Sequence, residues 1–523
     1  SIRHRKEDCL RLPDVNSFGK SGLLMSENLH TPRMTFKWIQ LVVISSGVFL
    51  SSLDVTVNVA LPIISDYFDA EPRTVYLMIT FYLGTGVALQ LGVGRAGDLF
   101  GLRNIFLVGL VSYTIAMIAI GLSPTIESVI VFRILQAVGN ASLLAISPAL
   151  ATSLFPSEMR GRALGVMTGI GTLGMVAGTL SAGLMLEYVS WHWIFLGRLP
   201  ICLISIIGTI VLLKEIGRNT QPKFFTCVGD SKTACSVRSF DFMGAAAVFV
   251  AVVALVAYLN IGAVRGWIQV ESMLLLVVSL VIWVFFLRRQ TAVKSPLLKL
   301  AIFKNVAVSA GVGSNLLLNM GTFVNVFILP YFASEIMGVP PVTLGIFLML
   351  TSVAISMCSP VGGYISDRVE PGLVTVVGML IVTTGLASFT MLSEDASVRE
   401  VAARMLVIGA GMGIFQSANL SLIMGGVTGE DLGTGGALSA ISRGMGSVTA
   451  VAIMGGIFAS IYSSNSPGVG ILSASTTHES VNAYVAAFRI VYWVATALTA
   501  LGIVTSFLAW KGTGFRRGGR TAK

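Results

Sequence analysis

Charged residues are scarce in this sequence, and their scarcity excludes an ordinary soluble fold. Asp, Glu, Lys and Arg make up 11% of the 523 residues, hydrophobic residues make up 54%, and the mean hydropathy is +0.84. Soluble globular domains hold about 25% charged residues. We therefore expect a polytopic membrane protein. The net charge of +10 does not indicate nucleic-acid binding, because the Lys and Arg lie mainly at the ends of apolar runs, as membrane topology requires.

Cysteine is also rare, and the residue groups that carry out catalysis are missing. The five cysteines are Cys9, Cys202, Cys227, Cys235 and Cys358. Cys227 and Cys235 lack the close spacing of a zinc site, and a disulfide framework is not expected. The sequence contains no metal-ligand cluster, no nucleophile beside a base and no complete phosphate-binding loop. We therefore expect no enzyme activity, no metal and no cofactor.

Long apolar runs, by contrast, fill the chain. A helix needs about 20 apolar residues to cross a bilayer. Runs of that length lie near residues 36–64, 74–96, 104–123, 127–153, 163–186, 192–213, 241–262, 268–287, 305–334, 342–365, 372–392, 400–427, 434–462 and 484–510. The sequence thus predicts an all-α membrane protein with fourteen transmembrane helices.

Basic residues gather in alternate connections between these runs. The connections after the second, fourth, sixth and eighth runs are rich in Lys and Arg, as is the C-terminal tail, and the other connections are poor in them. Because basic loops stay in the cytoplasm, both termini are expected there. We expect a disordered cytoplasmic tail at 1–35, cytoplasmic loops at 215–240 and 289–304, and a basic tail at 511–523.

An internal repeat divides the chain. VNVALP at 57–62 recurs as VNVFILP at 324–330, the stretch before Asp98 recurs before Asp367, Arg133-Ile-Leu recurs at Arg404, and GRAL at 161–164 recurs as GGAL at 435–438. The matches keep the same order and a nearly constant offset. We therefore expect a six-helix half at 36–214, two inserted helices at 241–288 and a second six-helix half at 305–510, a known transporter plan.

Asp54 lies inside the first apolar run and is the most informative single residue. A carboxylate at the centre of a spanning helix costs ~2.5–3.5 kcal/mol on insertion scales, so it marks a functional site by default. Arg133, in the fourth run, lies at a similar depth in the outer half of the membrane. If hydration and the Arg distance change with conformation, the carboxylate can load and release a proton. Asp54 is thus predicted to carry a proton and Arg133 to tune it; the alternative is that Asp54 only neutralises Arg133.

A glycine-rich connection follows the second run and recurs in the second half. It holds Gly94, Asp98, Gly101 and Arg103. Glycines allow a tight turn and close helix contact, and Asp98 can accept from a neighbouring helix N-terminus or pair with a nearby Arg. With its echo at Asp367 and Arg368, we interpret it as a latch on the cytoplasmic side rather than as an ordinary charged turn.

Other polar residues form stripes along the predicted helices. The amides are Asn58, Gln90, Gln136, Asn140, Asn315, Asn319, Gln416 and Asn419. They can line a substrate cavity or only tie helices together, and both readings stay open. Arg443, in the thirteenth run, needs either a carboxylate partner or an anionic ligand, and a partner is the favoured interpretation.

Several motifs together resemble a known family. LDVTVNVALP at 53–62, GRAGDLFGLR at 94–103 and RILQAVG at 133–139 resemble signatures of the major facilitator superfamily, in its fourteen-helix drug:proton antiporter branch of EmrB/QacA type. The resemblance covers about residues 36–510. Gly174, Gly178 and Gly183 resemble the antiporter motif of helix five, although Thr179 stands where that family has Pro.

The resemblance implies a proton-coupled exporter of hydrophobic or amphipathic, cationic compounds, working by alternating access in a bacterial cytoplasmic membrane. Its partners would be protons, small-molecule substrates and membrane lipids, and an accessory periplasmic adaptor is compatible with the family; nucleic acid is not. Two alternatives remain. One is export of a defined lipid, siderophore or metabolite on the same scaffold, and the other is a sensor or channel that transports nothing actively.

Overall fold

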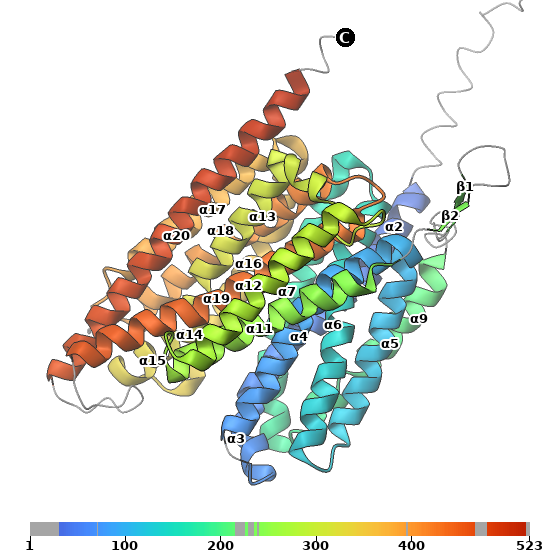
Figure 1. Ribbon diagram of the computed structural model, residues 1–523. Coiled ribbons are helices and arrows are strands. Elements are labelled where there is room, and N and C mark those ends of the chain that lie inside the picture. The colour runs from blue at the N-terminus through green and yellow to red at the C-terminus, as the bar shows by residue number, and fades with distance from the viewer. Residues whose placement is uncertain are drawn as a thin grey trace, which may run out of the picture.

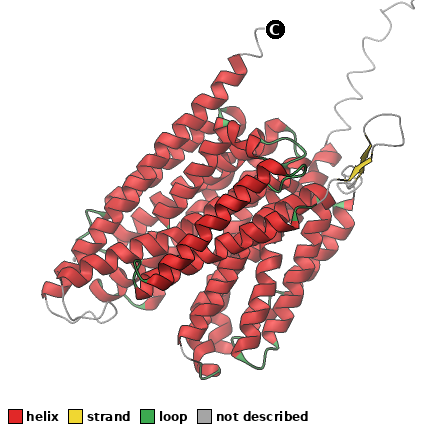
Figure 2. Cartoon of the chain, viewed as in Figure 1, coloured by secondary structure: helices red, strands yellow, loops and turns green. Residues whose placement is uncertain are grey.

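The computed structural model of the chain is a bundle of long helices (Figure 1). It describes residues 31–70, 72–214, 225–227, 235–237, 240–393, 396–465 and 478–518. Helix dominates this part of the chain, as Figure 2 shows. Its strands are β1 (Phe225–Cys227) and β2 (Cys235–Val237), an antiparallel pair inside the connection expected at 215–240, with Cys227 opposite Cys235.

The predicted all-α fold with fourteen spans is confirmed. Thirteen helical segments of the described chain are long and apolar enough to cross a membrane, and α4, with 29 residues, takes the place of the second span. In chain order the helices are α2 (Thr31–Ser52), η1 (Leu53–Val55), α3 (Thr56–Tyr67), α4 (Pro72–Phe100), α5 (Leu102–Gly121), α6 (Ile126–Leu154), η2 (Ser157–Met159), α7 (Arg160–Tyr188), α8 (Trp193–Leu196), α9 (Leu199–Leu212), α11 (Phe242–Arg265), α12 (Val270–Ala292), η3 (Leu300–Lys304), α13 (Val306–Thr322), α14 (Val324–Phe327), α15 (Leu329–Tyr331), η4 (Phe332–Ile336), α16 (Pro341–Arg368), α17 (Pro371–Phe389), α18 (Val398–Gly426), α19 (Leu432–Asn465) and α20 (His478–Gly518).

Both expected tail boundaries are wrong. α2 begins at Thr31, inside the tail expected through residue 35. A Pro next to the first helical residue, here Pro32, suits a helix start because its missing N–H would have had no partner there. α20 continues to Gly518, beyond residue 510, and its basic end suits the negative pole of the helix dipole. The remaining residues of both predicted tails lie outside the described part.

The first and ninth spans, expected to be continuous, are broken, as is the sixth between α8 and α9. The first changes from α2 to the 3-10 turn η1 and back to α3, and Asp54 lies in that turn. The ninth is divided into α13, α14, α15 and the π-type turn η4. Pro330 accounts for the break in the ninth span, because a proline inside a helix removes a backbone donor and clashes with the preceding turn. Apolar length predicted these spans but carries no information on such breaks.

The buried apolar side chains form two main clusters. One cluster of buried side chains is formed almost entirely by residues between Leu41 and Leu213, and a second by residues between Leu318 and Ala495. The most extensive contacts between the groups are those of α7 with α16 and of α4 with α19; α6 also contacts α19, and α7 contacts α18. The inserted α11 and α12 pack on each other, and α11 also contacts α4 and α19 (Figure 1).

Candidate functional site

Asp54 is buried at the meeting point of four other elements. Its Oδ1 accepts from Tyr113 of α5 at 2.9 Å and from Gln136 of α6 at 2.8 Å. Tyr82 of α4 donates to Oδ2, and Arg198, which precedes α9, forms an ion pair with Oδ1. A carboxylate surrounded by donors acts only as an acceptor, so this arrangement fits the ionised form.

Arg133 is buried near Asp54 but does not form the expected ion pair with it. Its Nη1 donates to Gln136 Oε1 at 2.5 Å, and its guanidinium lies 4.5 Å from the ring centre of Tyr82. Gln136 therefore connects Arg133 to Asp54, because its Nε2 donates to the carboxylate. The direct charge partner is Arg198, which also donates to the Leu53 carbonyl at 2.8 Å.

Sequence reasoning missed Arg198, although a signal was present. It is a cation inside the apolar run at 192–213, and ionisable residues in spanning segments mark functional contacts by default. The same argument that selected Asp54 and Arg133 selects Arg198. Its partner could not have been named from the sequence, because the apolar runs give no distance between the first and sixth spans.

The two latch aspartates bind helix N-termini across the two halves. Asp98, at the end of α4, accepts from the backbone N–H groups of Gly433 at 2.6 Å and Thr434 at 3.0 Å, and from the Thr434 hydroxyl at 2.7 Å. Asp367, at the end of α16, accepts from the N–H groups of Gly161 at 2.7 Å and Arg162 at 3.0 Å. Each carboxylate thus caps the first turn of a helix in the other half, where the helix dipole favours a negative charge.

The remaining latch residues play different parts. At Gly94, an added Cβ would lie 2.5 Å from the Gly433 carbonyl oxygen, so α4 and α19 can meet only with glycine there. Gly101 has φ of 95° and allows the turn into α5. Arg103 and Arg368 do not join the latch: Arg103 donates to the carbonyls of Thr209 and Ile210 in its own half, and Arg368 lies over the Tyr364 ring. Arg162 takes that role by donating to Asp367 at 3.1 Å.

The latches also correct the register of the internal repeat. The sequence match paired GRAL at 161–164 with GGAL at 435–438. In the structure, Gly161 binds Asp367 as Gly433 binds Asp98. The equivalent of Gly161 is therefore Gly433, two residues earlier. The four-residue segments are similar in sequence, but the equivalent positions in the two halves are those whose backbone N–H groups cap the latch aspartates.

The predicted amides divide into ties and unpartnered groups. Asn315 donates to the Ser439 carbonyl at 2.9 Å and to Ser442 at 2.8 Å, which ties α13 to α19, and Asn319 donates back to Asn315. The side-chain oxygens of Gln90, Asn140 and Asn419 are buried and have no partner among the described residues. Gln416 is half-buried. The side chain of Asn58 lies outside the described part.

Comparison with known proteins gives the family. The sequence model of the Major Facilitator Superfamily matches residues 44–451. The chain belongs to this superfamily. The tetracenomycin C resistance and export protein of Streptomyces glaucescens is 26% identical over 435 residues, which are 82% of this chain and 78% of that protein. The riboflavin transporter RibZ of Clostridioides difficile (strain 630) is 24% identical over 476 residues, which are 90% and 97%.

A solved structure agrees on the fold. The human organic anion transporter MFSD10 (TETRAN) matches with a TM-score of 0.58 at 12% identity, over 90% of this chain and 99% of that one. At this identity the likeness concerns the fold alone. The transporter fold and the drug-export relatives agree with the resemblance read from the motifs, and the chain is an integral membrane protein of this superfamily.

The helix-five motif of this superfamily member serves packing inside the first half. α7 is continuous. At Thr179, the side-chain hydroxyl donates to the carbonyl of Met175, and the backbone N–H that a Pro would lack is present. An added Cβ at Gly174 would lie 2.5 Å from the Phe49 carbonyl oxygen, which shows how closely α7 approaches α2. Gly178 is buried, and Gly183 lies in the same helix, outside the residues whose burial is described. The role of these glycines in antiport stays a prediction.

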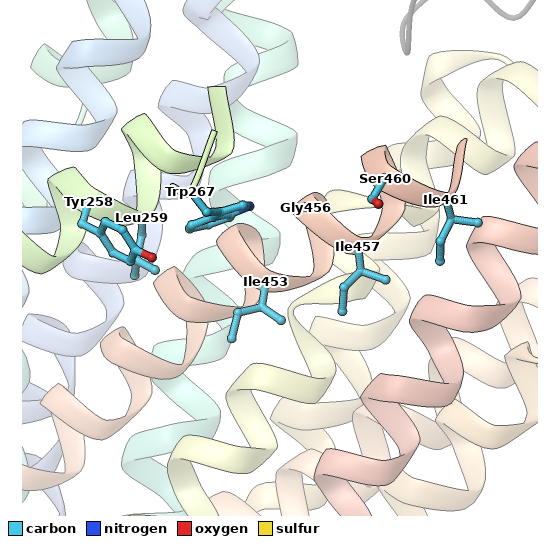
Figure 3. A pocket seen from close by; sticks show the side chains of 8 residues that line it. All are labelled: Tyr258, Leu259, Trp267, Ile453, Gly456, Ile457, Ser460 and Ile461. Atoms are coloured by element: carbon cyan, nitrogen blue, oxygen red, sulfur yellow. The ribbon is translucent and has the colours of Figure 1, made fainter. Parts of the chain in front are cut away.

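An apolar pocket of about 580 Å³ lies between the inserted α11 and α19. Figure 3 shows Tyr258 and Leu259 of α11 on one side, Ile453 and Ile457 of α19 on the other, and Trp267 between them. Trp267 packs on Tyr258 with ring centres 5.7 Å apart. The repeat sets the inserted helices outside the two six-helix halves, and we therefore predict that they contribute no transport residue. α11 nevertheless supplies one wall of this pocket.

Proposed function

We propose that this protein is a proton-coupled exporter of amphipathic compounds that works by alternating access. The observation that carries the proposal is the position of Asp54, a buried carboxylate in a broken span whose partners come from α4, α5, α6 and the start of α9. A relative movement of these elements changes the number of donors and the hydration around the carboxylate. Its affinity for a proton then depends on conformation.

The proton and the conformation are coupled through Arg198. An ionised Asp54 holds Arg198, and a protonated Asp54 has no charge to offer it. Loading a proton therefore releases the guanidinium toward its other contacts, the Leu53 carbonyl and the Tyr113 hydroxyl at 2.9 Å. Arg133 responds through Gln136. Asp54 is thus the proposed carrier, Arg198 its charge partner and Arg133 a tuning residue one contact further away.

The latches supply the second half of the cycle. Asp98 and Asp367 hold the two halves together at the end of the bundle where α7 and α19 begin. Charge-assisted hydrogen bonds contribute ~1.5–3 kcal/mol each, so this end opens only when several of them break together. The basic connections support a cytoplasmic position for this end. Residence in a bacterial cytoplasmic membrane with both termini inside, and an accessory periplasmic adaptor, belong to the same proposal.

The comparisons support export over the alternatives. One relative is named for resistance to tetracenomycin C and its export, and a second for transport of riboflavin. The first favours efflux of an amphipathic compound, and the second keeps a defined metabolite as the rival substrate. A compound panel in an exporter-deficient host separates them, because an efflux pump protects against several unrelated compounds and a dedicated carrier moves one.

The test of proton coupling uses Asp54→Asn in proteoliposomes with an imposed pH gradient. With the wild-type protein, the pH of the lumen is expected to change only when substrate is present. The variant is expected to lose this substrate-dependent proton movement while still binding a neutral substrate. Asn keeps the volume and one of the two acceptor oxygens, so retained binding reports that the variant is folded. Proton movement retained by Asp54→Asn would place the carrier elsewhere.

A further inference from the structure

Arg443 faces the space between the two halves. Seven residues before it on α19, and therefore on nearly the same helical face, lies Gly436, where an added Cβ would be 2.1 Å from the Ala145 carbonyl oxygen of α6. Its neighbours point elsewhere: Ser442 binds Asn315 of α13, and Gly444 packs on Val87 of α4. Arg443 thus lies between α13 and α4 and is directed toward α6 of the first half.

Arg443 has no ion pair and no side-chain hydrogen bond among the residues that the structure describes. It is partly exposed, although its helix is enclosed by α4, α6, α11, α13 and α20. The carboxylate partner favoured by the sequence interpretation is therefore absent from this part of the chain. A cation held inside a membrane protein needs an anion, and in this position a ligand can supply it.

The first half also holds a cation that contacts no carboxylate among the described residues. This is Arg133 of α6, which is buried against Gln136 and the Tyr82 ring. Asp54 is engaged by Arg198. α6 and α19 run in opposite directions. At ~1.5 Å per residue, Arg443 lies ~10 Å along α19 from the Gly436–Ala145 contact, and Asn140 lies ~8 Å along α6 from it, on the same side. Asn140 brings an unpartnered amide to the level of Arg443. Together with Arg443, Arg133 and Arg198 make three arginines against one carboxylate, Asp54.

We propose that the exported compound is an amphipathic organic acid whose carboxylate, sulfonate or phosphate group binds Arg443, on the face that α19 turns toward α6 of the first half. This inference rests on the export function proposed above and replaces the cationic compounds that the family resemblance implied. A cationic substrate would meet like charges without a free carboxylate, which costs binding energy. An acid bridges the two halves, so its binding is sensitive to their relative position.

The experiment compares three probes with one apolar body: pyrenebutanoate, pyrenebutanol and pyrenebutylammonium. Binding to the purified full-length protein in detergent is measured by energy transfer from tryptophan to pyrene. The acid is expected to bind at least about tenfold more tightly than the alcohol, and the ammonium compound most weakly. Equal affinities, or tighter binding of the ammonium compound, would overturn the proposal.

Three variants assign the preference to Arg443. Arg443→Gln is expected to remove most of the preference for the acid and to leave the affinity for the alcohol unchanged, which also reports that the protein is folded. Arg443→Lys keeps the charge and is expected to keep most of the preference. Arg404→Gln is the matched control, because Arg404 already has Glu400 as an ion-pair partner at 3.8 Å. If Arg443→Gln kept the wild-type preference for the acid over the alcohol, the anion-binding site would lie elsewhere.

Transport of the same probes separates this inference from the proposed function. If the acid binds preferentially but no pH gradient drives its movement in proteoliposomes, proton-coupled export fails and the anion site stands. If a pH gradient drives the ammonium compound in preference to the acid, export stands and the anion site fails.

Discussion

Asp54 and Arg198 form a buried ion pair, and its contribution to the stability of the protein depends on both charges being present. Taking two charges out of water costs several kcal/mol per ion, and the pair recovers this only when its remaining hydrogen bonds are made. Here Tyr82, Tyr113 and Gln136 complete the shell of the carboxylate. Removing one charge leaves the other buried without a partner, whereas removing both leaves neutral groups that can still bond to each other.

We therefore predict that Arg198→Gln destabilises the protein more than the double variant Asp54→Asn/Arg198→Gln. The single change leaves an unpaired buried carboxylate and is expected to cost ~3–5 kcal/mol, of which the second change recovers a large part. Thermal unfolding in detergent, followed by tryptophan fluorescence, measures both. Arg133→Gln is the control, because Arg133 contacts Asp54 only through Gln136. If the single and double variants unfolded at the same temperature, Arg198 would not be the charge partner.

The sequence allowed Asp54 to be identified but not its surroundings. A lone carboxylate in an apolar run is costly wherever the neighbouring helices lie, so Asp54 could be predicted without a structure. Which cation reaches it depends on helix packing, and Arg133 and Arg198 are both cations in spanning runs. In the structure Arg198 pairs with Asp54 and also donates to the carbonyl of Leu53 in the 3-10 turn Leu53–Val55, a turn that the apolar pattern does not show.

At the scale of the elements, the latch uses the first turns of α7 and α19. Those turns carry backbone N–H groups without helical partners, and Asp98 and Asp367 supply the acceptors from the other half. Ser356 and Ser359 of α16 add hydrogen bonds to the carbonyls of Gly169 and Gly165 along α7. The contact between α7 and α16 is thus polar and made of small residues, which suits an interface that closes and opens.

Asp367→Asn is expected to favour the state that is open at the latch end. The change removes the charge from the hydrogen bonds to Gly161 and Arg162 and weakens the closed state by ~1–2 kcal/mol, which corresponds to a shift of roughly 5- to 30-fold in the ratio of open to closed protein. The measurement is the labelling rate of Ser359→Cys by a soluble maleimide in a cysteine-free background. Ser359 is fully buried in the closed contact.

Glu370→Gln is the control for this experiment, since Glu370 precedes α17 and takes no part in the latch. Asp98→Asn is expected to act in the same direction at the other contact, between α4 and α19. Labelling that is unchanged in both aspartate variants would mean that these contacts do not govern opening.

For the whole molecule, the pattern of apolar runs and basic connections was sufficient to predict fourteen spans, because bilayer thickness fixes helix length and charge fixes orientation. The repeat was sufficient to predict equivalent latches in the two halves. It could not give their register, since Gly161 and Gly433 are equivalent by the hydrogen bonds they donate and not by neighbouring letters. The repeat also could not show which helices meet, and the pairing of α7 with α16 and α4 with α19 came from the structure.

The orientation of the molecule gives the last prediction. With fourteen spans and a cytoplasmic N-terminus, the connection between α19 and α20 lies outside the cell, and the one between α9 and α11 lies inside. Ser466→Cys is therefore expected to react with a membrane-impermeant maleimide in intact cells, and Ser231→Cys only after the membrane is opened. Both residues lie in connections, so neither substitution disturbs a described helix. Protection of Ser466→Cys together with labelling of Ser231→Cys would invert the protein, and the latch would then close the outer side. Labelling of both from outside would require an even number of spans between them, whereas the fourteen-span arrangement has seven.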